Sequence, residues 1–390
     1  MFAVMVSSRL PPQLQPNALA RAVAAARARG SAISDLTNSN PTAAGIAYPD
    51  GLLAPLADAA GLRYEPHPFG LPAARAAVAA DHGRRGMSID PAHVVLTAST
   101  SEAYSWLFKL LCDAGDSVLV PRPSYPLFEH LTALENVHAY PYDLEYHGRW
   151  SIEMASLMTA PERTRAVLAV SPNNPTGSYL SAEELAALTQ LCGARRWALV
   201  VDEVFADYPL DAREPLTDIA VRTDVPTFSL AGLSKSVGLP QLKLAWIVAG
   251  GPAAARDQAL TALEVVADSY LSVATPVQVA VPQLLRAGAS VRAAIQQRIR
   301  QNLDALRAEV RSFAACDVLR LEGGWSAVLR VPATRREETL VVDLVEREGI
   351  LVHPGYFFDF PREAYLVVSL LPPPAMFADA AARLLRFVSD

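Results

Sequence analysis

The segment RAVLAVSPNNPTGSYLSAEELAALTQLCGARRWALVVDE, residues 165–203, contains the pattern that decides the fold. An apolar run at Arg165–Val170 leads into a loop rich in Pro and Asn, then a helical pattern at 181–194, then a second apolar run at Ala198–Val201. Short apolar strands that alternate with helices are typical of parallel pairs buried on both faces. The segment therefore predicts one strand–helix–strand unit of an α/β sheet.

The same alternation extends from about residue 71 to residue 250. Further short strands are expected at His93–Thr97, Ser117–Val120, Thr227–Leu230 and Leu244–Ala249. Further helices are expected at 72–82, 101–113, 125–133 and 253–268. Strands and helices in this order predict a three-layer domain, in which a mostly parallel sheet is covered by helices on both faces.

The pattern changes after about residue 285, where longer helices and isolated strands follow one another. Helices are expected near 290–313, 336–348 and 374–388, and strands at Trp325–Val331 and Tyr365–Leu370. This order predicts a smaller α+β domain, which an N-terminal helix at 17–29 joins. The predicted division assigns 45–280 to the large, ligand-binding domain, and 1–44 with 281–390 to the small one.

Composition excludes several classes of protein. The chain has 390 residues, of which 51% are hydrophobic, and a net charge of −6, which argues against a nucleic-acid partner. It contains no run of 18 apolar residues, and Met1–Val6 is short and lacks a basic flank, so we expect neither a membrane helix nor a signal peptide. The three cysteines and seven histidines are scattered. We therefore expect reduced thiols, no metal site and a cytoplasmic location.

Lysine is rare in this chain and occurs only at Lys109, Lys235 and Lys243, against 31 arginines (34 basic residues minus 3). A lysine amine can form a Schiff base with a carbonyl group, whereas a guanidinium cannot. Lys235 lies in Leu233-Ser234-Lys235-Ser236, directly after a predicted strand, where α/β proteins bind ligands. Lys235 is therefore the candidate covalent residue, and Lys243, eight residues later, is a candidate partner for an anionic ligand.

Three other polar segments follow predicted strands. Thr97–Glu102 places small hydroxyl residues at a helix N-terminus, which suits an anion such as phosphate, or serves only as a helix cap. Ser171–Gly177 is dense in turn-forming residues and is either a plain turn or a ligand-binding loop. Asp202 ends an apolar strand, where a carboxylate needs a cation, a helix N-terminus or a strong donor as its partner.

The order and spacing of Asn174, Asp202 and Lys235 resemble those of the pyridoxal-phosphate aminotransferases of fold type I, class I/II. The resemblance extends from about residue 36 to residue 371. It implies bound pyridoxal 5′-phosphate and transamination between small-molecule amino and oxo substrates. Lys235 matches the lysine that forms the Schiff base, Asp202 the carboxylate that keeps the pyridine nitrogen protonated, and Asn174 the donor to the phenolic oxygen.

The resemblance also implies contacts around the rest of the cofactor. Tyr125 matches the aromatic residue that stacks on the ring, and Tyr64 matches a tyrosine that reaches the phosphate of the neighbouring subunit in a homodimer. Phosphate contacts are implied for Ser99, Thr100, Ser234 and Lys243. The segments Asn40-Pro41 and His353-Pro354-Gly355 match the two that line the substrate side.

Three positions depart from the family pattern. Phe205 stands where a tyrosine usually donates to the phenolic oxygen of the cofactor, and Lys243 stands where arginine is commoner. Val367 occupies the position of the arginine that holds the substrate carboxylate, so recognition of ordinary α-amino acids is an open question. The possible replacements are Arg122, Arg330 and Arg362, although surface ion pairs are the alternative for each.

Three classes of function fit these residues. The first is an aminotransferase that acts by a two-step ping-pong mechanism. The second is a pyridoxal-phosphate lyase, decarboxylase or cyclase, since such enzymes share the cofactor residues. The third is a cofactor-binding sensor, but residues 1–35 contain no basic helix-turn-helix pattern that would bind DNA. Trp325 and Tyr356-Phe357-Phe358 either line the substrate side or pack in the core.

Overall fold

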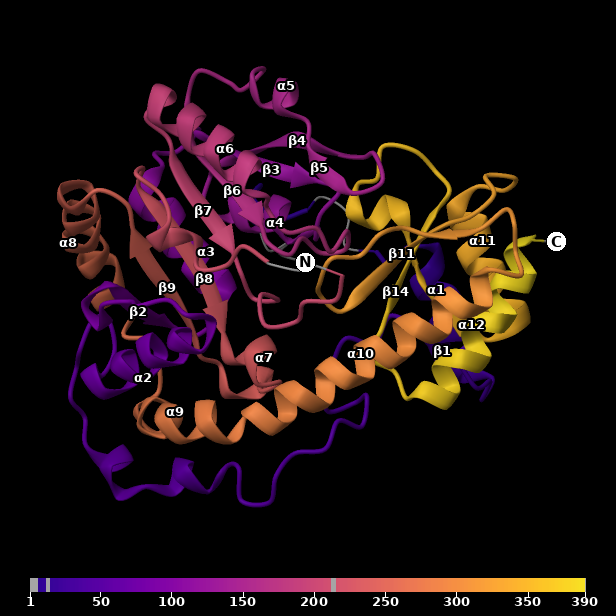
Figure 1. The fold of residues 1–390 in the computed structure, drawn as a ribbon, viewed down its shortest axis with the longest axis horizontal. Coiled ribbons are helices and arrows are strands. Elements are labelled where there is room, and N and C mark those ends of the chain that lie inside the picture. Colours follow the sequence, from indigo (N-terminus) through magenta and orange to yellow (C-terminus); the bar gives the residue numbers. More distant parts are fainter. Residues whose placement is uncertain (1–5, 12–14, 212–214, 390) are drawn as a thin grey trace, which may run out of the picture.

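An eight-stranded sheet in the order β2-β9-β8-β7-β6-β3-β4-β5 organises the larger part of the molecule (Figure 1). The computed structural model describes residues 6–11, 15–211 and 215–389. In the segment Met1–Val6, which we do not expect to be a signal peptide, residues Met1–Met5 therefore lie outside the described residues. The strands are β2 (Val94–Thr97), β3 (Ser117–Arg122), β4 (His138–Tyr146), β5 (Trp150–Ile152), β6 (Thr164–Val170), β7 (Ala198–Asp202), β8 (Thr227–Gly232) and β9 (Ala245–Gly250).

Strand direction brings the predicted ligand-binding segments to one edge of this sheet. β4, β3, β6, β7 and β8 pair in parallel, whereas β5 is antiparallel to β4, and β9 is antiparallel to both β8 and β2. Because β2 is reversed relative to β9, it runs in the same direction as β8. The carboxyl ends of β2, β3, β6, β7 and β8 therefore meet at one edge, and the predicted mostly parallel α/β sheet is confirmed.

Helices cover both faces of the sheet because its central strands are apolar on both sides. Val118 and Val120 of β3 belong to the cluster beneath α3 (Thr100–Leu111), α4 (Leu127–Leu134) and α8 (Ala253–Tyr270). Leu119 points to the opposite face, which α6 (Ala182–Arg195) covers, while α2 (Pro72–His82) and α9 (Thr275–Ala287) pack behind β2 and β9. This alternation along one strand confirms the three-layer architecture.

The C-terminal part of the chain builds a separate antiparallel sheet in the order β10-β11-β14-β13. Its strands are β10 (Asp317–Val318), β11 (Ser326–Arg330), β13 (His353–Pro354) and β14 (Tyr365–Ser369), with the helices α11 (Glu337–Asp343) and α12 (Pro374–Ser389). α1 (Ala18–Ala28) packs on α11, and β1 (Ser34–Asp35) pairs with β12 (Ile350–Leu351). α10 (Ala289–Val310) runs from α9 to α12 (Figure 1). The division at residues 44/45 and 280/281 remains a prediction.

Two elements form where the sequence pattern gives little sign of them. β4 contains Pro141 and several polar residues, and it is tolerated near the edge, where only β3 and the short β5 flank it. α9 carries Pro276 near its start and Pro282 in its interior, which lowers its helix propensity. Burial of Val281 and Leu284 against the core outweighs that loss.

The cysteines lie apart from one another, and Cys112, Cys192 and Cys316 are free thiols. Burial raises the pKa of both Cys112 and Cys192 to about 12, which keeps these two thiols protonated and unreactive near neutral pH. Among the described residues, no helix combines the length and the apolar character needed to cross a membrane.

A matched pair of glycines tests the close contact between β9 and the turn that precedes β8. A Cβ on Gly250 would lie 1.7 Å from the Ala220 carbonyl oxygen, whereas one on Gly193 in α6 would meet only Val225 Cγ1, at 3.6 Å. We expect Gly250→Ala to lower the free energy of unfolding by about 1–3 kcal/mol through overpacking. Gly193→Ala should raise it by about 0.5–1 kcal/mol.

Urea unfolding monitored by circular dichroism measures both changes. Equal stability of Gly250→Ala and the wild type would contradict the packing described for β9.

Candidate active site

A cavity of about 360 Å³ opens between the carboxyl edge of the large sheet and the small C-terminal sheet. Its lining includes most of the cofactor residues expected from the sequence, namely Thr100, Tyr125, Asn174, Asp202, Phe205, Ser234 and Lys235. The substrate side adds Thr37, Ser39, Trp325, Ser326, His353, Phe357, Phe358, Val367 and Ser369. The volume lies within the roughly 300–1,000 Å³ of small-molecule sites.

Lys235 reaches this cavity from a single turn of helix, α7 (Leu233–Ser236), directly after β8. The Tyr208 hydroxyl donates to the Lys235 carbonyl oxygen at 2.5 Å and fixes the turn. The Lys235 amine lies 4.9 Å from the Trp325 ring centroid and 5.6 Å from that of Phe205. Removal from bulk water lowers the pKa of Lys235 to about 8, although the nearby Asp202 carboxylate opposes this. The amine is therefore partly neutral, and nucleophilic, close to physiological pH.

Asp202 is the last residue of β7 and enters the same cavity. Its carboxylate accepts hydrogen bonds from the Val204 backbone N–H at 3.0 Å and from the Tyr104 hydroxyl at 3.2 Å. Dense protein surroundings raise the pKa of Asp202 to about 6, while these two donors and Lys235 oppose the rise. Such a carboxylate gains stability from a buried cation, and a protonated ring nitrogen is one.

Tyr104 is a site residue that sequence reasoning missed. It lies one turn after Thr100 on α3 and is buried, with its ring against Phe108 and Phe128. Burial and the neighbouring Asp202 carboxylate raise its pKa, so the hydroxyl stays protonated and donates. The spacing of four residues from Thr100 places both side chains on one helix face, which was the available signal.

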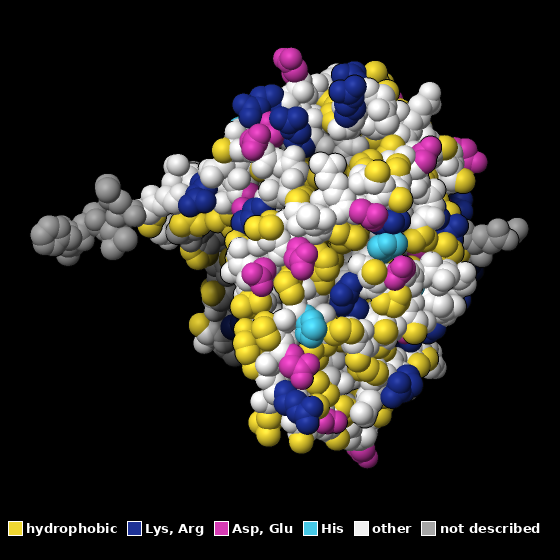
Figure 2. Space-filling model, turned by 90° about the vertical axis from the view of Figure 1, so that its left-hand side faces the viewer, with side chains coloured by type: hydrophobic (Ala, Val, Ile, Leu, Met, Phe, Trp, Pro, Cys, Tyr) yellow, Lys and Arg dark blue, Asp and Glu magenta, His cyan; other side chains and the backbone are white. Residues whose placement is uncertain are grey.

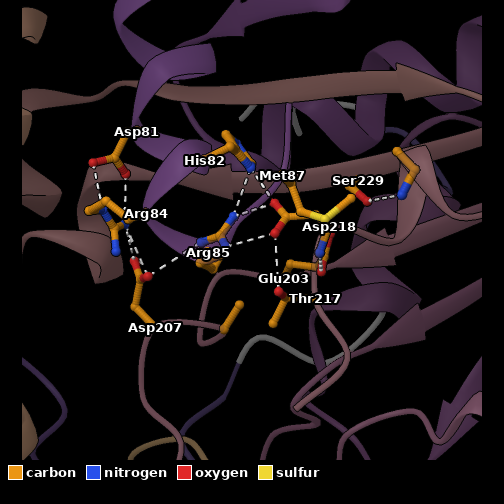
Figure 3. Close-up of polar contacts among 12 residues, drawn as sticks. Asp81, His82, Arg84, Arg85, Met87, Glu203, Asp207, Thr217, Asp218 and Ser229 are labelled. Atoms are coloured by element: carbon orange, nitrogen blue, oxygen red, sulfur yellow. Dashed lines mark hydrogen bonds and ion pairs between the residues drawn. The ribbon is translucent and has the colours of Figure 1, made fainter. Parts of the chain in front are cut away.

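A charged network holds the segment that follows Asp202, and Figure 3 shows its side chains. The Glu203 carboxylate accepts from the Asp218 backbone N–H at 2.6 Å, and burial raises the pKa of Glu203 to about 7. Arg85 donates to Asp218 at 2.6 Å and to Asp207 at 3.3 Å. His82 also forms a hydrogen bond with Asp218. Burial of Asp218 opposes its ionisation, but the contacts with His82 and Arg85 outweigh burial and keep the pKa of Asp218 below its usual range. These contacts link the two ends of the loop between β7 and β8.

The N-terminus of α3 is closed by a helix cap, and anion binding there remains a prediction. Ser99 Oγ accepts from the Glu102 backbone N–H at 3.1 Å, and the Glu102 carboxylate accepts from the Ala98 N–H at 2.6 Å. The backbone N–H groups of Thr100 and Ser101 have no partner within the helix. The helix dipole and the Thr100 hydroxyl favour a negative group there, which fits a phosphate.

The loop after β6 is a structural turn that presents Asn174. The neighbouring Asn173 holds the loop, since its amide donates to the Pro123 carbonyl at 3.0 Å and accepts from Ser124 Oγ at 2.9 Å. Asn174 instead lines the cavity, where Ser326 Oγ donates to its side-chain oxygen at 3.4 Å. The loop is therefore a structural turn held by Asn173, and ligand binding by Asn174 remains a prediction.

Some of the expected residues lie outside the cavity. Lys243 is exposed and is absent from the cavity lining, and Tyr64 is 73% exposed in a separate hollow with Leu271. Asn40 is exposed and caps a turn by accepting from the Thr42 N–H. The segment before it reaches the cavity through Thr37 and Ser39 instead.

The substrate side contains no arginine among the described lining residues. Val367 is 1% exposed and lines the cavity where the family arginine would stand. Arg122 pairs with Asp143 at 2.6 Å and Arg330 pairs with Asp317 at 3.0 Å, both at the surface, and Arg362 is exposed. Surface ion pairs are therefore the observed role of the first two.

Aromatic side chains form much of the substrate-side wall. Trp325, Phe357 and Phe358 line the cavity, whereas Tyr356 is 41% exposed and does not. Trp325 also packs edge-on against Phe205, at 5.3 Å between ring centroids. Trp325 and Phe358 therefore both line the cavity and pack in the core, whereas Phe357 lines the cavity and is 39% exposed.

The fold is α/β, and one cavity brings together the Lys235 amine, the Asp202 carboxylate and the N-terminal end of α3. Comparison with known families matches the model described as aminotransferase class I and II over residues 35–384, so the chain belongs to that family. The family depends on pyridoxal phosphate, and the protein is accordingly a transaminase.

Individual relatives are similar but distant. An alanine aminotransferase of Mycobacterium tuberculosis is 26% identical over 302 residues, which cover 76% of this chain and 70% of the relative. A glutamate-pyruvate aminotransferase of Haemophilus influenzae is 24% identical over 375 residues, covering 93% and 92%. The solved structure of an alanine aminotransferase from Pyrococcus furiosus has a TM-score of 0.87 at 22% identity, with 95% of each chain covered.

The donor set of the cavity suits pyridoxal phosphate. Asp202 supplies a carboxylate in need of a cation, Lys235 supplies an amine for which no hydrogen-bond partner is recorded among the described residues, and the start of α3 supplies an anion site. Asn174 and Ser234 add neutral polar groups to the lining. Asp202 complements a ring cation, Lys235 complements a carbonyl carbon, and the start of α3 complements a phosphate. The neutral groups of Asn174 and Ser234 suit the polar atoms between these parts of the cofactor.

The three lysines make the pKa of Lys235 measurable residue by residue. In the cofactor-free protein, reductive ¹³C-methylation followed by NMR should show a lysine signal that titrates with a midpoint of about 8. Its absence in Lys235→Ala assigns it and separates it from the signal of the N-terminal amine, which titrates at roughly 7.7–8.0. Because the Asp202 carboxylate stabilises the protonated amine, Asp202→Asn should move that midpoint lower still. A midpoint for Lys235 at the ordinary lysine value of roughly 10.4 would contradict the electrostatics described.

Proposed function

We propose that Lys235, Asp202 and Asn174 form the reacting centre of this aminotransferase. The Lys235 amine and the Asp202 carboxylate line one cavity, where loss of water disfavours the charged form of each. This observation carries the proposal. Bound pyridoxal phosphate supplies a carbonyl carbon that takes up amines and a cationic ring into which the electrons of a broken substrate bond can delocalise.

The chain's own residues have distinct tasks in this proposal. The Lys235 amine would hold bound pyridoxal phosphate covalently, and it is the group that would accept and return a proton at the substrate α-carbon. The Asp202 carboxylate keeps a proton on the ring nitrogen, and Tyr104 holds that carboxylate in place. Asn174 donates to the ring oxygen, and Phe205 beside it offers no second donor.

The remaining residues hold the cofactor in place and exclude water from the amine. The α3 N-terminus with Ser99, Thr100 and Ser234 binds the phosphate, with Lys243 at longer range, and Tyr125 covers the ring. The Trp325 ring next to Lys235 keeps water from the amine.

We propose an amino acid as the donor and a 2-oxo acid as the acceptor, in two half-reactions, as the names of the relatives suggest. Elimination, decarboxylation and cyclisation are not favoured by the family assignment.

Loss of the Lys235 amine is the direct test of this function. Lys235→Ala should lose the visible band of the bound cofactor and reduce kcat by at least about 10²–10⁴-fold, the range of a lost acid–base group. Lys109→Ala is the control, because that side chain pairs with Glu135 away from the cavity. In the wild type an amino donor should bleach the band, and a 2-oxo acid should restore it.

An unaltered band and rate in Lys235→Ala would contradict the assignment of this lysine. Bleaching by donors with release of ammonia or carbon dioxide, and no recovery with any oxo acid, would contradict transamination.

We also propose a homodimer in which Tyr64 reaches the phosphate site of the partner. Tyr64 is 73% exposed and Leu62 is 90% exposed, and the nearby Tyr270 and Leu271 are each 49% exposed. Figure 2 views the side of the molecule to the left in Figure 1, and hydrophobic side chains reach its surface between charged ones. A large exposed tyrosine beside exposed leucines favours an interface.

Size-exclusion chromatography with light scattering should give twice the 41.8 kDa chain mass. Tyr64→Phe should remain a dimer but bind the cofactor roughly tenfold or more weakly, since one hydrogen bond to a charged group is lost. Tyr270→Phe is the control and should bind it like the wild type. A monomer that binds the cofactor fully would contradict the proposal.

We propose a cytoplasmic location for the enzyme. Its three cysteines are free thiols, and Cys192 and Cys316 are buried. Free thiols are usual in a reducing compartment.

A further inference from the structure

The cavity lacks the guanidinium that would hold a substrate carboxylate. A carboxylate that enters an apolar cavity loses water and needs a cation or strong donors in return. Val367 supplies neither, and Lys235, the only Lys or Arg among the described lining residues, is assigned to the cofactor. Some other residue near Val367 must therefore take up this interaction if the substrates are amino acids.

His353 is placed to do so. It lies on β13, and in the antiparallel pair of β13 and β14 its register partner is Val367. Side chains of residues paired in this way lie on the same face of a sheet, and both of these line the cavity. His353 therefore occupies the side of the cavity from which a longer side chain at position 367 would act.

The surroundings of the His353 ring hold it while leaving its nitrogens available. The imidazole stacks on Phe357 at 5.1 Å and 10°, and it meets Phe358 edge-on at 5.6 Å. No hydrogen bond or ion pair is recorded for either ring nitrogen within residues 6–11, 15–211 and 215–389. A ring that is held in place and has free nitrogens on the wall of the cavity can donate a hydrogen bond to a ligand there.

We propose that His353 binds the α-carboxylate of the amino and oxo substrates in place of the missing arginine. The inference rests on the proposed function, because it assumes substrates that carry a carboxylate next to the reacting carbon. The imidazole donates a hydrogen bond from one ring nitrogen to a carboxylate oxygen. Without a substrate, burial lowers the pKa of His353, and an incoming carboxylate favours the protonated ring and so strengthens the bond.

Equilibrium binding to the holoenzyme tests this contact without turnover. The probes are 3-phenylpropanoate and its neutral analogue 3-phenylpropan-1-ol, whose aromatic body suits the wall formed by Phe357 and Trp325. The wild type should bind the carboxylate at least about tenfold more tightly than the alcohol, the worth of one charge-assisted hydrogen bond. His353→Phe, which keeps the stack on Phe357 but has no donor, should abolish that preference by weakening only the binding of the carboxylate. His147→Phe is the matched control, because His147 is exposed and pairs with Glu145.

A second variant separates loss of the contact from loss of the fold. His353→Phe combined with Val367→Arg should restore the preference for the carboxylate, since it supplies the family's fork. If His353→Phe no longer holds the cofactor, His353→Leu, which also has no donor, takes its place in the same titration. The cofactor band reports in every variant that the site is intact.

Two results would overturn the inference. An unchanged carboxylate preference in His353→Phe, or in His353→Leu where that variant replaces it, would mean that another group binds the carboxylate. Equal affinity of the wild type for both probes would mean that the site recognises no carboxylate and that amines are the substrates. Failure of the proposed function is recognised separately, since a cofactor band that no donor bleaches concerns Lys235 and not His353.

Discussion

The Asp202 carboxylate and the Lys235 amine lose bulk water in one cavity, and each favours the charged form of the other. Loss of water alone would push the pKa of Asp202 further up and that of Lys235 further down. Their placement follows from β7 and β8, which are neighbouring parallel strands whose carboxyl ends share one edge. The rest of the site is arranged around this pair.

The structure around Asp202 and Lys235 holds the two side chains in place. Behind Asp202, buried Glu203 ties the start of the β7–β8 loop to its end through the Asp218 and Ile219 backbone N–H groups. Arg85 donates hydrogen bonds to both Asp207 and Asp218 and so links these two residues of the same loop (Figure 3). A charged residue that is paired and bonded on several sides is costly to displace, so this network keeps the cavity wall rigid.

The sequence is informative where a single strand or loop determines the outcome. The strand–helix alternation predicted the sheet, and the position of Lys235, Asp202 and Asn174 after three strands predicted that they would meet. Contacts between distant segments were not accessible in this way. Tyr104 bonds Asp202 across 98 residues, and the pairing of His353 with Val367 depends on a strand register that no local pattern specifies. Packing also overrode propensity in α9, which contains two prolines.

The chain matches the family pattern at Lys235, Asp202 and Asn174, and it departs from that pattern at Phe205 and Lys243 on the cofactor side and at Val367 on the substrate side. Such differences are expected when function is set by residues grafted on a common fold. The most direct measurement of the central claim is borohydride reduction of the holoenzyme, followed by proteolysis and mass spectrometry of the lysine-containing peptides. We predict a single pyridoxyl-modified residue, Lys235. A modification on Lys109 or Lys243, or none on any lysine, would contradict it.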